Sequence, residues 1–556
     1  MNSFKNYTIP FTPAKAYSTK VAYFSMEFAV DQSLKIFSGG LGFLAGSHMR
    51  SAYELEQNMI GIGILWKYGY YDQVRDPDNK MGVMWQQKSY NFLQDTGIQF
   101  QITINDHPVW VKAMYLPPER FGSAPLFLLT TDVKENDYLS KTITNCLYDS
   151  NPETKIAQSI ILGVGGAKLL DEINYGAEVY HLNEAHGLSA AFYLYAKDHN
   201  IQSVREKLVL TTHTPVDAGN EKHNIDQLFK MSFFQDLTLK EVKEISGIKG
   251  ETFDHTLVAL RMAKMANGVS KIHGEVANEM WGKYENIAPI ISITNSQNHN
   301  YWADEKLNNA ANSKNIKEFD ARKKELKKRL FINLADQTGK WFDPNVLTIV
   351  WARRFAGYKR ADLITRDIEQ FKEIICNAKM PVQIIWAGKP YPKDQGAVQM
   401  FNDLVVFCSN YPNVAIMTGY EMRLSKLLKQ GSDVWLNNPR IPQEASGTSG
   451  MTAAMNGCVN LSTWDGWIPE FVEHGKNGFV VPPVDYEKLS EEEQDKADMD
   501  NLFKIIKDEI TPLYYNDPKG WFKVVARAMQ EISPEFESGR MAKDYYTKLY
   551  KNKALF

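Results

Sequence analysis

The sequence predicts an α/β protein of two or more lobes, each built on a mostly parallel β-sheet. The chain has 556 residues, which is too many for a single hydrophobic core. Short runs of β-branched and aromatic residues alternate with longer stretches of helical pattern, as in sheets whose parallel strands are joined by helices. In the second half of the chain each short run is followed by a loop that contains Gly, Pro or Asn, which are typical turn residues.

The first half of the chain predicts one lobe over residues 1–300. Its candidate strands cover residues 21–28, 178–182, 208–212 and 290–294. Between about residues 96 and 131 apolar and polar residues alternate, which is typical of strands with one exposed face. We therefore expect an antiparallel insertion in this part of the first lobe.

The second half repeats the pattern in a predicted lobe over residues 346–510. Its candidate strands cover residues 347–352, 383–387, 415–418, 433–436 and 459–462. Residues 301–345 are polar and helix-prone and predict a helical connection, in which the basic run 322–329 is expected to be a solvated helix face. Residues 511–556 are again helix-prone and rich in aromatic residues, and they could pack back on the first lobe.

Bulk composition restricts the classes of function. The formal net charge of -3 gives no electrostatic reason to expect nucleic acid or a membrane as partner. No stretch approaches the ~18–20 apolar residues that a membrane span needs, and the first residues lack the pattern of a secretory signal. The four cysteines form no Cys-x-x-Cys pair, which disfavours a disulfide framework or a zinc site. The expectation is a cytoplasmic protein that binds small molecules and holds no metal.

Two segments are candidates for binding a phosphate group. Gly39 and Gly40 lie in a loop that follows a strand and opens a helix, where glycine lets backbone N–H groups approach an anion. An ordinary tight turn explains this loop equally well. The second segment, 353–360 (RRFAGYKR), places four cations directly after a predicted strand. Such crowding favours an anion that neutralises it, since Arg offers a planar fork and Lys a point charge; a basic surface loop is the alternative.

The segment from Glu444 to Thr448 (EASGT) is the strongest candidate for a sugar site. Small residues and hydroxyls lead into a predicted helix that continues to Asn456, and its free N–H groups would form a cradle for an anion. Glu444 would accept hydrogen bonds from sugar hydroxyls. The alternative is an ordinary helix for which Ser446 or Thr448 supplies only a cap.

Two histidine-containing segments follow strands of the first lobe. They are 181–186 (HLNEAH) and 211–215 (TTHTP), and they could supply acid–base groups or metal ligands. No spacing typical of zinc ligands occurs, and no G-x-S-x-G motif supports a serine hydrolase. Structural roles are the more common explanation for such isolated pairs.

Together these segments resemble the α-glucan (glycogen, starch, maltodextrin) phosphorylase family in its short form. The matching text runs in the family's order: YFSMEF, SGGLGFLAG, LYDSNPETKIAQ, YHLNEAHG, TTHTP, NGVSKIHGEV, ARRFAGYKR, AGKPYP, EASGTSGM and DGW. The resemblance covers nearly the whole chain and implies the GT-B architecture, two facing Rossmann-like lobes with a cleft between them. It also implies an enzyme that moves a glucosyl unit between the non-reducing end of an α-1,4-glucan and phosphate, with retention of configuration.

The resemblance also implies roles for individual residues. The backbone carbonyl of His213 would face the developing oxocarbenium ion, Glu444 would hold sugar hydroxyls, and Arg354 and Lys359 match ligands of the substrate and cofactor phosphates. The matches to substrate-binding positions are Gly39, Gly40, Leu41, His181, Asn295, Ser446 and Gly447. The matches to positions that bind a cofactor or nucleotide phosphate are Arg353, Thr448, Ser449, Gly450 and Thr452.

The sequence departs from the family at two positions. Family members bind pyridoxal phosphate as a Schiff base to a lysine just after the cradle, and this chain has Thr452 there. A threonine hydroxyl cannot form an imine, so we expect no covalent pyridoxal phosphate at this position. The second departure is Ser296, which stands where the family has glycine and is followed by altered text.

Three hypotheses follow from these departures. The chain could carry out phosphorolysis with non-covalent pyridoxal phosphate, because in the family the cofactor's phosphate, not its aldehyde, transfers the proton. It could instead be a nucleotide-sugar glucosyltransferase, in which Thr452, eight positions after Glu444, contacts the ribose and Arg354 and Lys359 hold the diphosphate. The third hypothesis is a non-catalytic paralogue that binds glucan or regulates a partner, against which the intact charged segments count. A homodimer is compatible with all three.

Overall fold

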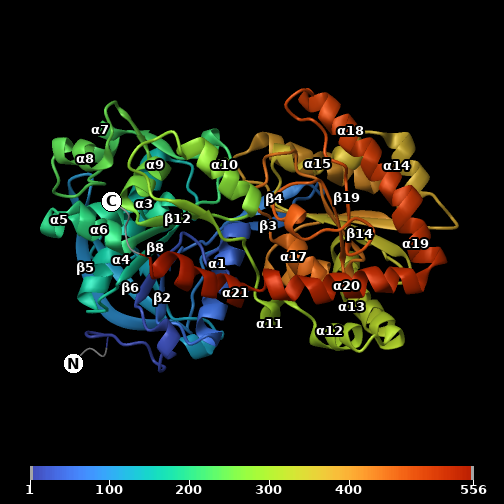
Figure 1. Ribbon diagram of the computed structural model, residues 1–556, viewed down its shortest axis with the longest axis horizontal. Coiled ribbons are helices and arrows are strands. Elements are labelled where there is room, and N and C mark those ends of the chain that lie inside the picture. The colour runs from blue at the N-terminus through green and yellow to red at the C-terminus, as the bar shows by residue number, and fades with distance from the viewer. Residues whose placement is uncertain (1–3, 553–556) are drawn as a thin grey trace. The chain divides into compact units, whose positions relative to one another are not determined.

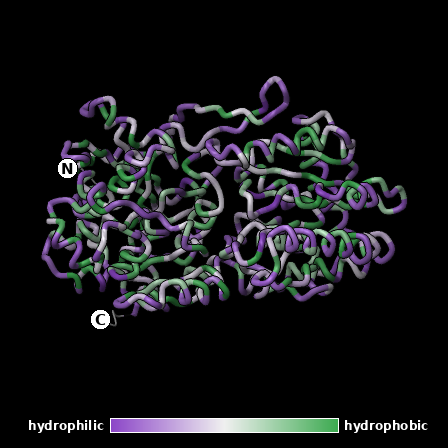
Figure 2. Tube along the Cα trace, turned by 90° about the horizontal axis from the view of Figure 1, so that it is seen from above, coloured by the Kyte–Doolittle hydropathy of each residue, from purple (hydrophilic) through white to green (hydrophobic). Residues whose placement is uncertain are grey.

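The computed structural model describes residues 4–552 as two compact units (Figure 1). Unit 1 holds residues 4–71, 85–298 and 538–552 of the described chain, and unit 2 holds Asp72–Met84 and His299–Glu537. In each unit the hydrophobic parts of the trace gather inside and the hydrophilic parts lie along the outer loops (Figure 2). No helix within residues 4–552 combines the length and the apolar character that crossing a membrane requires.

Unit 1 is built on a sheet that has nine strands in the described chain, in the order β13-β12-β9-β8-β1-β2-β7-β6-β5. Its strands are β1 (Val21–Phe24), β2 (Met59–Ile64), β5 (Gln94–Ile104), β6 (His107–Leu116), β7 (Leu126–Thr130), β8 (Val179–Asn183), β9 (Leu208–Thr211), β12 (Met265–Gly268) and β13 (Ile290–Ser292). Pairing is parallel from β13 to β7 and antiparallel through β7, β6 and β5. The four predicted strands and the antiparallel excursion are thus confirmed.

Helices flank this sheet. Those of unit 1 in the described chain are α1 (Gly40–Glu54), α2 (Tyr138–Thr142), α3 (Pro152–Ile160), α4 (Gly166–Glu172), α5 (Ser189–Asp198), α6 (Ile201–Lys207), α7 (Ile225–Lys230), α8 (Leu239–Ser246), α9 (His255–Met262), α10 (Lys271–Trp281) and α21 (Ser538–Asp544). A separate two-stranded antiparallel sheet pairs β10 (Lys222–Asn224) with β11 (Thr252–Asp254). Gly46 allows α1 to lie close to the chain after β1, because a Cβ there would be 2.0 Å from the carbonyl oxygen of Ala29.

Unit 2 is built on a parallel sheet that has six strands in the described chain, in the order β16-β15-β14-β17-β18-β19. These strands are β14 (Leu347–Ala352), β15 (Val382–Ala387), β16 (Val414–Met417), β17 (Val434–Asn437), β18 (Val459–Ser462) and β19 (Gly478–Val480). The five strands predicted for this half are confirmed. Each of β14, β15, β16, β17 and β18 is buried along its whole length, as expected for parallel strands covered on both faces.

The helices of unit 2 in the described chain are α11 (His299–Trp302), α12 (Glu305–Asn312), α13 (Ile316–Thr338), α14 (Ile368–Ile375), α15 (Gln395–Ser409), α16 (Met422–Gly431), α17 (Ser449–Ala454), α18 (Glu491–Ile505), α19 (Thr511–Asn516) and α20 (Pro518–Phe536). A hairpin of β3 (Asp72–Arg75) and β4 (Met81–Met84) also belongs to this unit. It is anchored there by the side chain of Gln73, which donates to the carbonyl oxygen of Gly388 at 2.9 Å.

Two predicted boundaries shift in the structure. Residues 301–345, predicted as a connection, are part of unit 2, where Phe319 of α13 packs edge-on against Phe522 of α20 at 5.2 Å between ring centroids. The helices that follow residue 511 stay in unit 2 up to Glu537, and only the segment from Ser538 packs on unit 1. There the side chain of Gln57 donates to the carbonyl oxygen of Ala542 at 3.2 Å, and α21 lies beside α1 (Figure 1).

The basic run of α13 is only partly solvated, which corrects the prediction of a solvated face. Lys323 and Lys327 are buried, at 6% and 1% exposure. Lys327 forms an ion pair with Asp433 and also donates to the carbonyl oxygen of Val346 at 2.7 Å. Residues four apart share one face of a helix, so a continuous basic run places some of its members inside.

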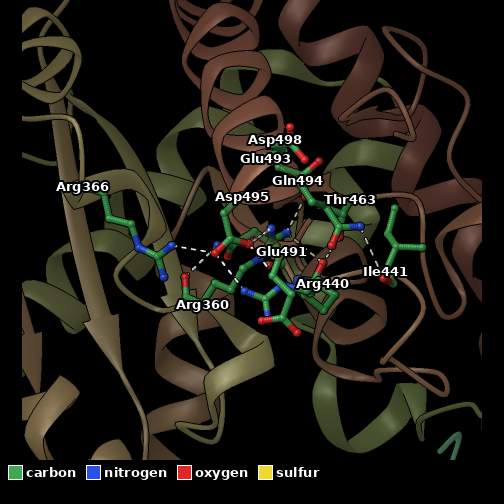
Figure 3. A network of polar contacts seen from close by, with 12 residues as sticks. Arg360, Arg366, Arg440, Ile441, Thr463, Glu491, Glu493, Gln494, Asp495 and Asp498 are labelled. Atoms are coloured by element: carbon green, nitrogen blue, oxygen red, sulfur yellow. Dashed lines mark hydrogen bonds and ion pairs between the residues drawn. The ribbon is translucent and has the colours of Figure 1, made fainter. Parts of the chain in front are cut away.

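Arg360, the last cation of the segment 353–360, is fully buried in a charge network (Figure 3). Its guanidinium binds Asp495 at 2.8 Å and Asp498 at 2.7 Å, both on α18. It also donates to the backbone carbonyl oxygens of Asn438 at 2.9 Å and Pro439 at 3.0 Å. The sequence predicted that a bound anion neutralises this segment; for Arg360 the neutralising anions are the two aspartates, and the network ties the loop after β17 to α18.

Replacing Arg360 by leucine should destabilise the protein strongly. The substitution leaves Asp498, which is itself fully buried, without its cation, and breaking a buried pair in this way costs about 3–5 kcal/mol. Urea unfolding measures the effect. Arg366→Leu is the control, because Arg366 is 39% exposed and such pairs contribute about 0–1 kcal/mol. Equal losses in the two variants would contradict this account of the network.

Candidate functional site

The charged side chains of unit 2 gather at the carboxyl ends of β14 and β17. These two strands are neighbours, and the chain continues outward from them in opposite directions across the sheet, through β15 and β16 on one side and β18 and β19 on the other. Ligands of parallel α/β sheets bind at such a switch point. Arg353 directly follows β14, and the loop after β17 leads to Glu444. The topology therefore brings together two segments that are 91 residues apart.

Glu444 is held by two buried cations. Its carboxylate oxygen Oε2 accepts hydrogen bonds from Arg353 Nη2 at 2.6 Å and from Lys359 Nζ. Burial favours the neutral acid, yet the charges of Arg353 and Lys359 outweigh it and lower the pKa of Glu444 to about 2. The site thus holds a carboxylate that is ionised throughout the neutral range.

Arg353 has one buried donor without a hydrogen-bond partner among the described residues. This atom is Nη1, the other end of the guanidinium that binds Glu444. An unpaired buried N–H costs about 1–3 kcal/mol, and such atoms mark places where a ligand is expected. A guanidinium offers paired donors that match phosphate oxygens. Arg354, in contrast, is exposed in the structure.

Asp465 fixes the backbone of Glu444, a role that the sequence did not predict. One of its carboxylate oxygens accepts the backbone N–H of Glu444 at 2.9 Å and the other that of Gly466 at 2.8 Å. Burial, together with the nearby charge of Glu444, raises the pKa of Asp465 to about 7. Gly466 has φ 62°, and a Cβ there would lie 2.2 Å from the carbonyl oxygen of Ser446. The Asp465–Gly466 pair of the DGW segment was the sequence signal that could have identified this role.

The predicted anion cradle is a short helix whose hydroxyls are used locally. Helix α17 ends at Ala454, earlier than predicted, because Gly457 with φ 65° turns the chain away. Thr448 is the N-cap residue, but its side chain makes no cap hydrogen bond. Ser449 Oγ accepts from the indole nitrogen of Trp435 at 3.2 Å, and Ser446 Oγ donates to the carbonyl oxygen of Gly447 at 3.4 Å.

Thr452 is fully buried, and its hydroxyl donates to the backbone carbonyl oxygen of Ser449 at 3.0 Å. This position offers no amine, so it does not fit a covalently bound pyridoxal phosphate. Gly450 is also enclosed, since a Cβ there would lie 2.4 Å from Asn460 Oδ1. The group that fits an anionic ligand in this unit is the Arg353 guanidinium, with Lys359 beside it.

In unit 1 the glycine loop faces a carboxylate. Glu27, which lies within the predicted strand 21–28 but three residues past the end of β1, accepts the backbone N–H of Ser38 at 2.6 Å and that of Gly39 at 3.1 Å. Tyr148 donates its hydroxyl to the same carboxylate at 2.8 Å. Burial raises the pKa of Glu27, although these hydrogen bonds act to lower it. The Gly39 N–H that was predicted to meet phosphate is therefore bound to Glu27, whereas a Cβ at Gly39 or Gly40 would meet open space.

His213 is held through both its backbone and its ring. Its backbone N–H donates to Glu184 Oε1 at 2.5 Å, and ring atom Nε2 lies 2.7 Å from Asn183 Oδ1. Burial lowers the pKa of His213 to about 3, so the ring is neutral at physiological pH. Glu184 has φ 67° and ψ 168°, a backbone conformation that is strained for any residue but glycine and that recurs at functional sites.

The other predicted residues of unit 1 have structural contacts. His181 is buried, and its two ring nitrogens lie 2.8 Å from the hydroxyl of Tyr550 and 2.7 Å from that of Thr211. Asn295 is 4% exposed with Oδ1 unpaired among the described residues. Leu41, in the first turn of α1, is half-buried. Among residues 4–552 no group of three or more His, Cys, Asp or Glu is arranged to hold a metal ion.

Glu184 should make stability depend on pH. Burial raises the pKa of Glu184 from 4.5 to about 7, so the folded chain keeps this proton to a higher pH than the unfolded chain does. The free energy of unfolding should therefore fall by about 3 kcal/mol between pH 4.5 and pH 8. Glu184→Gln keeps the oxygen Oε1, which accepts hydrogen bonds from His213 and Thr214, and should abolish this fall.

Urea unfolding at several pH values measures the difference between Glu184→Gln and the parent protein. The two should be equally stable near pH 4.5 and the variant more stable at pH 8. Glu206→Gln, at an exposed position of α6, is the matched control and should follow the parent. An unchanged pH slope in Glu184→Gln would contradict the assignment.

Comparison with known proteins agrees with this geometry. The sequence profile of the family described as carbohydrate phosphorylase matches residues 292–503, which include Arg353, Lys359 and Glu444. An uncharacterized protein of Methanocaldococcus jannaschii is 43% identical over 530 residues, which cover 95% of this chain and 99% of that protein.

Two relatives have named activities. Maltodextrin phosphorylase of Thermococcus litoralis is 33% identical over 595 residues, covering 96% of this chain and 71% of its own. Glycogen phosphorylase of Aquifex aeolicus is 31% identical over 610 residues, covering 96% of this chain and 86% of its own. The parallel α/β sheets of the two units agree with the GT-B type of fold. The chain therefore belongs to the carbohydrate phosphorylase family of glycosyltransferases.

Proposed function

We propose that the chain transfers a glucosyl unit between the non-reducing end of an α-1,4-glucan and phosphate, with retention of configuration. The observation that carries this proposal is the buried Nη1 of Arg353, which has no hydrogen-bond partner within residues 4–552 and belongs to the guanidinium that binds the ionised carboxylate of Glu444. A site for a sugar phosphate needs a donor for the phosphate oxygens and an acceptor for the sugar hydroxyls. Arg353 can supply the donor and Glu444 the acceptor. The names of the maltodextrin and glycogen phosphorylases support the choice of glucan.

Each residue of the unit 2 site would have its own role. Arg353 and Lys359 hold phosphate oxygens, and fixed cations of this kind stabilise the charge of a departing phosphate without reorganisation. Glu444 binds sugar hydroxyls, and Asp465 fixes its backbone through the hydrogen bond to its N–H at 2.9 Å. In unit 1, Glu184 orients the peptide of His213, whose carbonyl the family resemblance assigns to the reacting sugar.

The cofactor that the family implies would be held here without a bond to residue 452. Pyridoxal phosphate, when bound, supplies a phosphate group that can give and take a proton. Arg353 and Lys359 are the residues of this chain suited to hold that phosphate. Thr452 contributes neither an amine nor a free hydroxyl, because its hydroxyl donates to Ser449.

The hydrogen bond from the Thr452 hydroxyl to Ser449 disfavours the nucleotide-sugar alternative. That hypothesis needs Thr452 to bind a ribose hydroxyl, whereas the residue is 0% exposed. The non-catalytic alternative is disfavoured by the cost of burying Glu444, Arg353 and Lys359 together, which brings no benefit to a protein that binds no anion there.

A donor screen tests the proposal. Glucose 1-phosphate and nucleotide glucoses are each offered with maltooligosaccharide as acceptor, and chain extension is measured. Transfer from glucose 1-phosphate is the expected result. Transfer from nucleotide glucose alone would support the second hypothesis, and no transfer from either donor would overturn the proposed activity.

Replacing Arg353 by methionine should reduce transfer severely. The variant keeps the apolar stem and removes the guanidinium, and loss of one fixed group that stabilises developing charge costs about 10²–10³-fold in rate. Steady-state kinetics with glucose 1-phosphate measure the effect on kcat/KM. Lys372→Met removes an exposed lysine of α14 and is the control for loss of one positive charge in the same unit. A decrease no larger than in this control would contradict the role of Arg353.

A further inference from the structure

The β3–β4 hairpin is the part of unit 2 that comes from the first half of the chain. It spans Asp72–Met84, and the segments before and after it belong to unit 1. Gln73, in β3, is buried at 6% exposure and binds the main chain of the larger part of the unit. The roles assigned above to Arg353, Lys359 and Glu444 do not involve this residue.

The side-chain amide of Gln73 joins the loops that follow two neighbouring strands. Its nitrogen Nε2 donates to the carbonyl oxygen of Gly388 at 2.9 Å, and its oxygen Oε1 accepts the backbone N–H of Gly419 at 2.9 Å. Gly388 directly follows β15, and Gly419 comes two residues after β16. An amide side chain offers a donor and an acceptor, as a peptide group does. Gln73 therefore links the two loops as a peptide of an added strand would.

An ion pair links the same two loops. Lys389 follows Gly388, and Glu421 comes two residues after Gly419. Lys389 Nζ lies 3.1 Å from Glu421 Oε1, and the two side chains are 4% and 12% exposed. The loops after β15 and β16 are thus tied to each other beside the point that Gln73 binds. The hairpin therefore holds a connected pair of loops.

The main chain of Arg353 lies directly against Gly388. The N–H of Arg353 donates to the carbonyl oxygen of Ala387 at 3.2 Å. A Cβ at residue 388 would lie 2.1 Å from the carbonyl oxygen of Arg353 and 2.7 Å from the ring of Phe355, so this close approach requires glycine. Because protein interiors are close-packed, a shift of Gly388 displaces the backbone from which the Arg353 guanidinium extends to Glu444.

We propose that Gln73 is a positioning residue for the anion site of unit 2, because it holds Gly388 and thereby fixes the main chain of Arg353. The inference rests on the proposed function for the identity of the anion as phosphate. A fixed cation stabilises developing charge only if it is already in place, and a misplacement of about 1 Å costs up to about 10²-fold in rate. Gln73 touches no reacting atom, and its effect passes through Arg353.

Replacing Gln73 by methionine removes both hydrogen bonds and keeps the length of the side chain. The value of kcat/KM with glucose 1-phosphate should fall about 10–100-fold. Asn402→Leu is the matched control, because Asn402 Oδ1 accepts the backbone N–H of Met81 in the same hairpin at 2.9 Å. This control loosens the hairpin, leaves both bonds of Gln73 in place, and should keep kcat/KM close to that of the parent. Urea unfolding measures the stability that each variant loses, so the kinetics compare folded protein.

A double-mutant cycle separates positioning from a general structural effect. If Gln73 acts through Arg353, Gln73→Met should cause no further loss of kcat/KM once Arg353→Met is present. Independent effects on two sites add as free energies, whereas effects of residues that act as one unit do not. A full additional decrease in the double variant would overturn the inference, as would a decrease in Gln73→Met no larger than that in Asn402→Leu.

Calorimetric titration with inorganic phosphate tests the same point on the full-length protein without reference to transfer. The parent should bind phosphate, Arg353→Met should lose this binding, and Gln73→Met should bind more weakly than Asn402→Leu. Phosphate binding in the parent that does not depend on Arg353, or no phosphate binding at all, would overturn the inference.

The two proposals have separate outcomes. Weakened phosphate binding in Gln73→Met, together with no transfer from glucose 1-phosphate by the parent, would support the role of Gln73 and overturn the proposed function. Transfer by the parent, together with equal phosphate affinity and equal kcat/KM in Gln73→Met and Asn402→Leu, would do the reverse.

Discussion

The carboxylate of Glu444 is bound by two cations, and much of unit 2 is arranged around keeping these charges together. A single buried ion costs several kcal/mol, so Glu444, Arg353 and Lys359 can be buried only as a group. The adjacency of β14 and β17 brings the group together, and Asp465 fixes the backbone on which Glu444 stands. Among the residues that the structure describes, no partner is found for Nη1 of the Arg353 guanidinium.

Around this group the structure separates cations that hold the fold from cations suited to a ligand. Arg360 belongs to the same eight-residue segment as Arg353, yet its guanidinium donates to two aspartates and two backbone carbonyl oxygens of unit 2. Lys327 is likewise bound to Asp433. Arg360 thus holds the loop after β17, whereas Lys327 holds Val346 and Asp433, which directly precede β14 and β17. Arg353 differs from them, because its Nη1 atom has no hydrogen-bond partner among the described residues.

Several acids and bases of the two units have a pKa moved by burial toward or away from neutrality. Glu184 and Asp465 each have a pKa of about 7, and each accepts the N–H of a residue assigned to the chemistry, His213 and Glu444 respectively. Both are positioning residues. Because neither touches the reacting atoms in this account, their protonation would act through the backbone that they hold.

The sequence alone determined three features: those strands that are rich in β-branched residues, the family, and the identity of residue 452. Each depends on local residue pattern or on covalent chemistry, which the amino-acid sequence contains directly. Strands β2, β12 and β19, each of which contains glycine, escaped prediction. Only the tertiary structure decided that Arg353 meets Glu444, that Arg360 is neutralised by two aspartates of α18, and that Lys327 is paired with Asp433. These features depend on contacts between residues far apart in the chain, and burial, which sets the cost of a charge, exists only once the chain is folded.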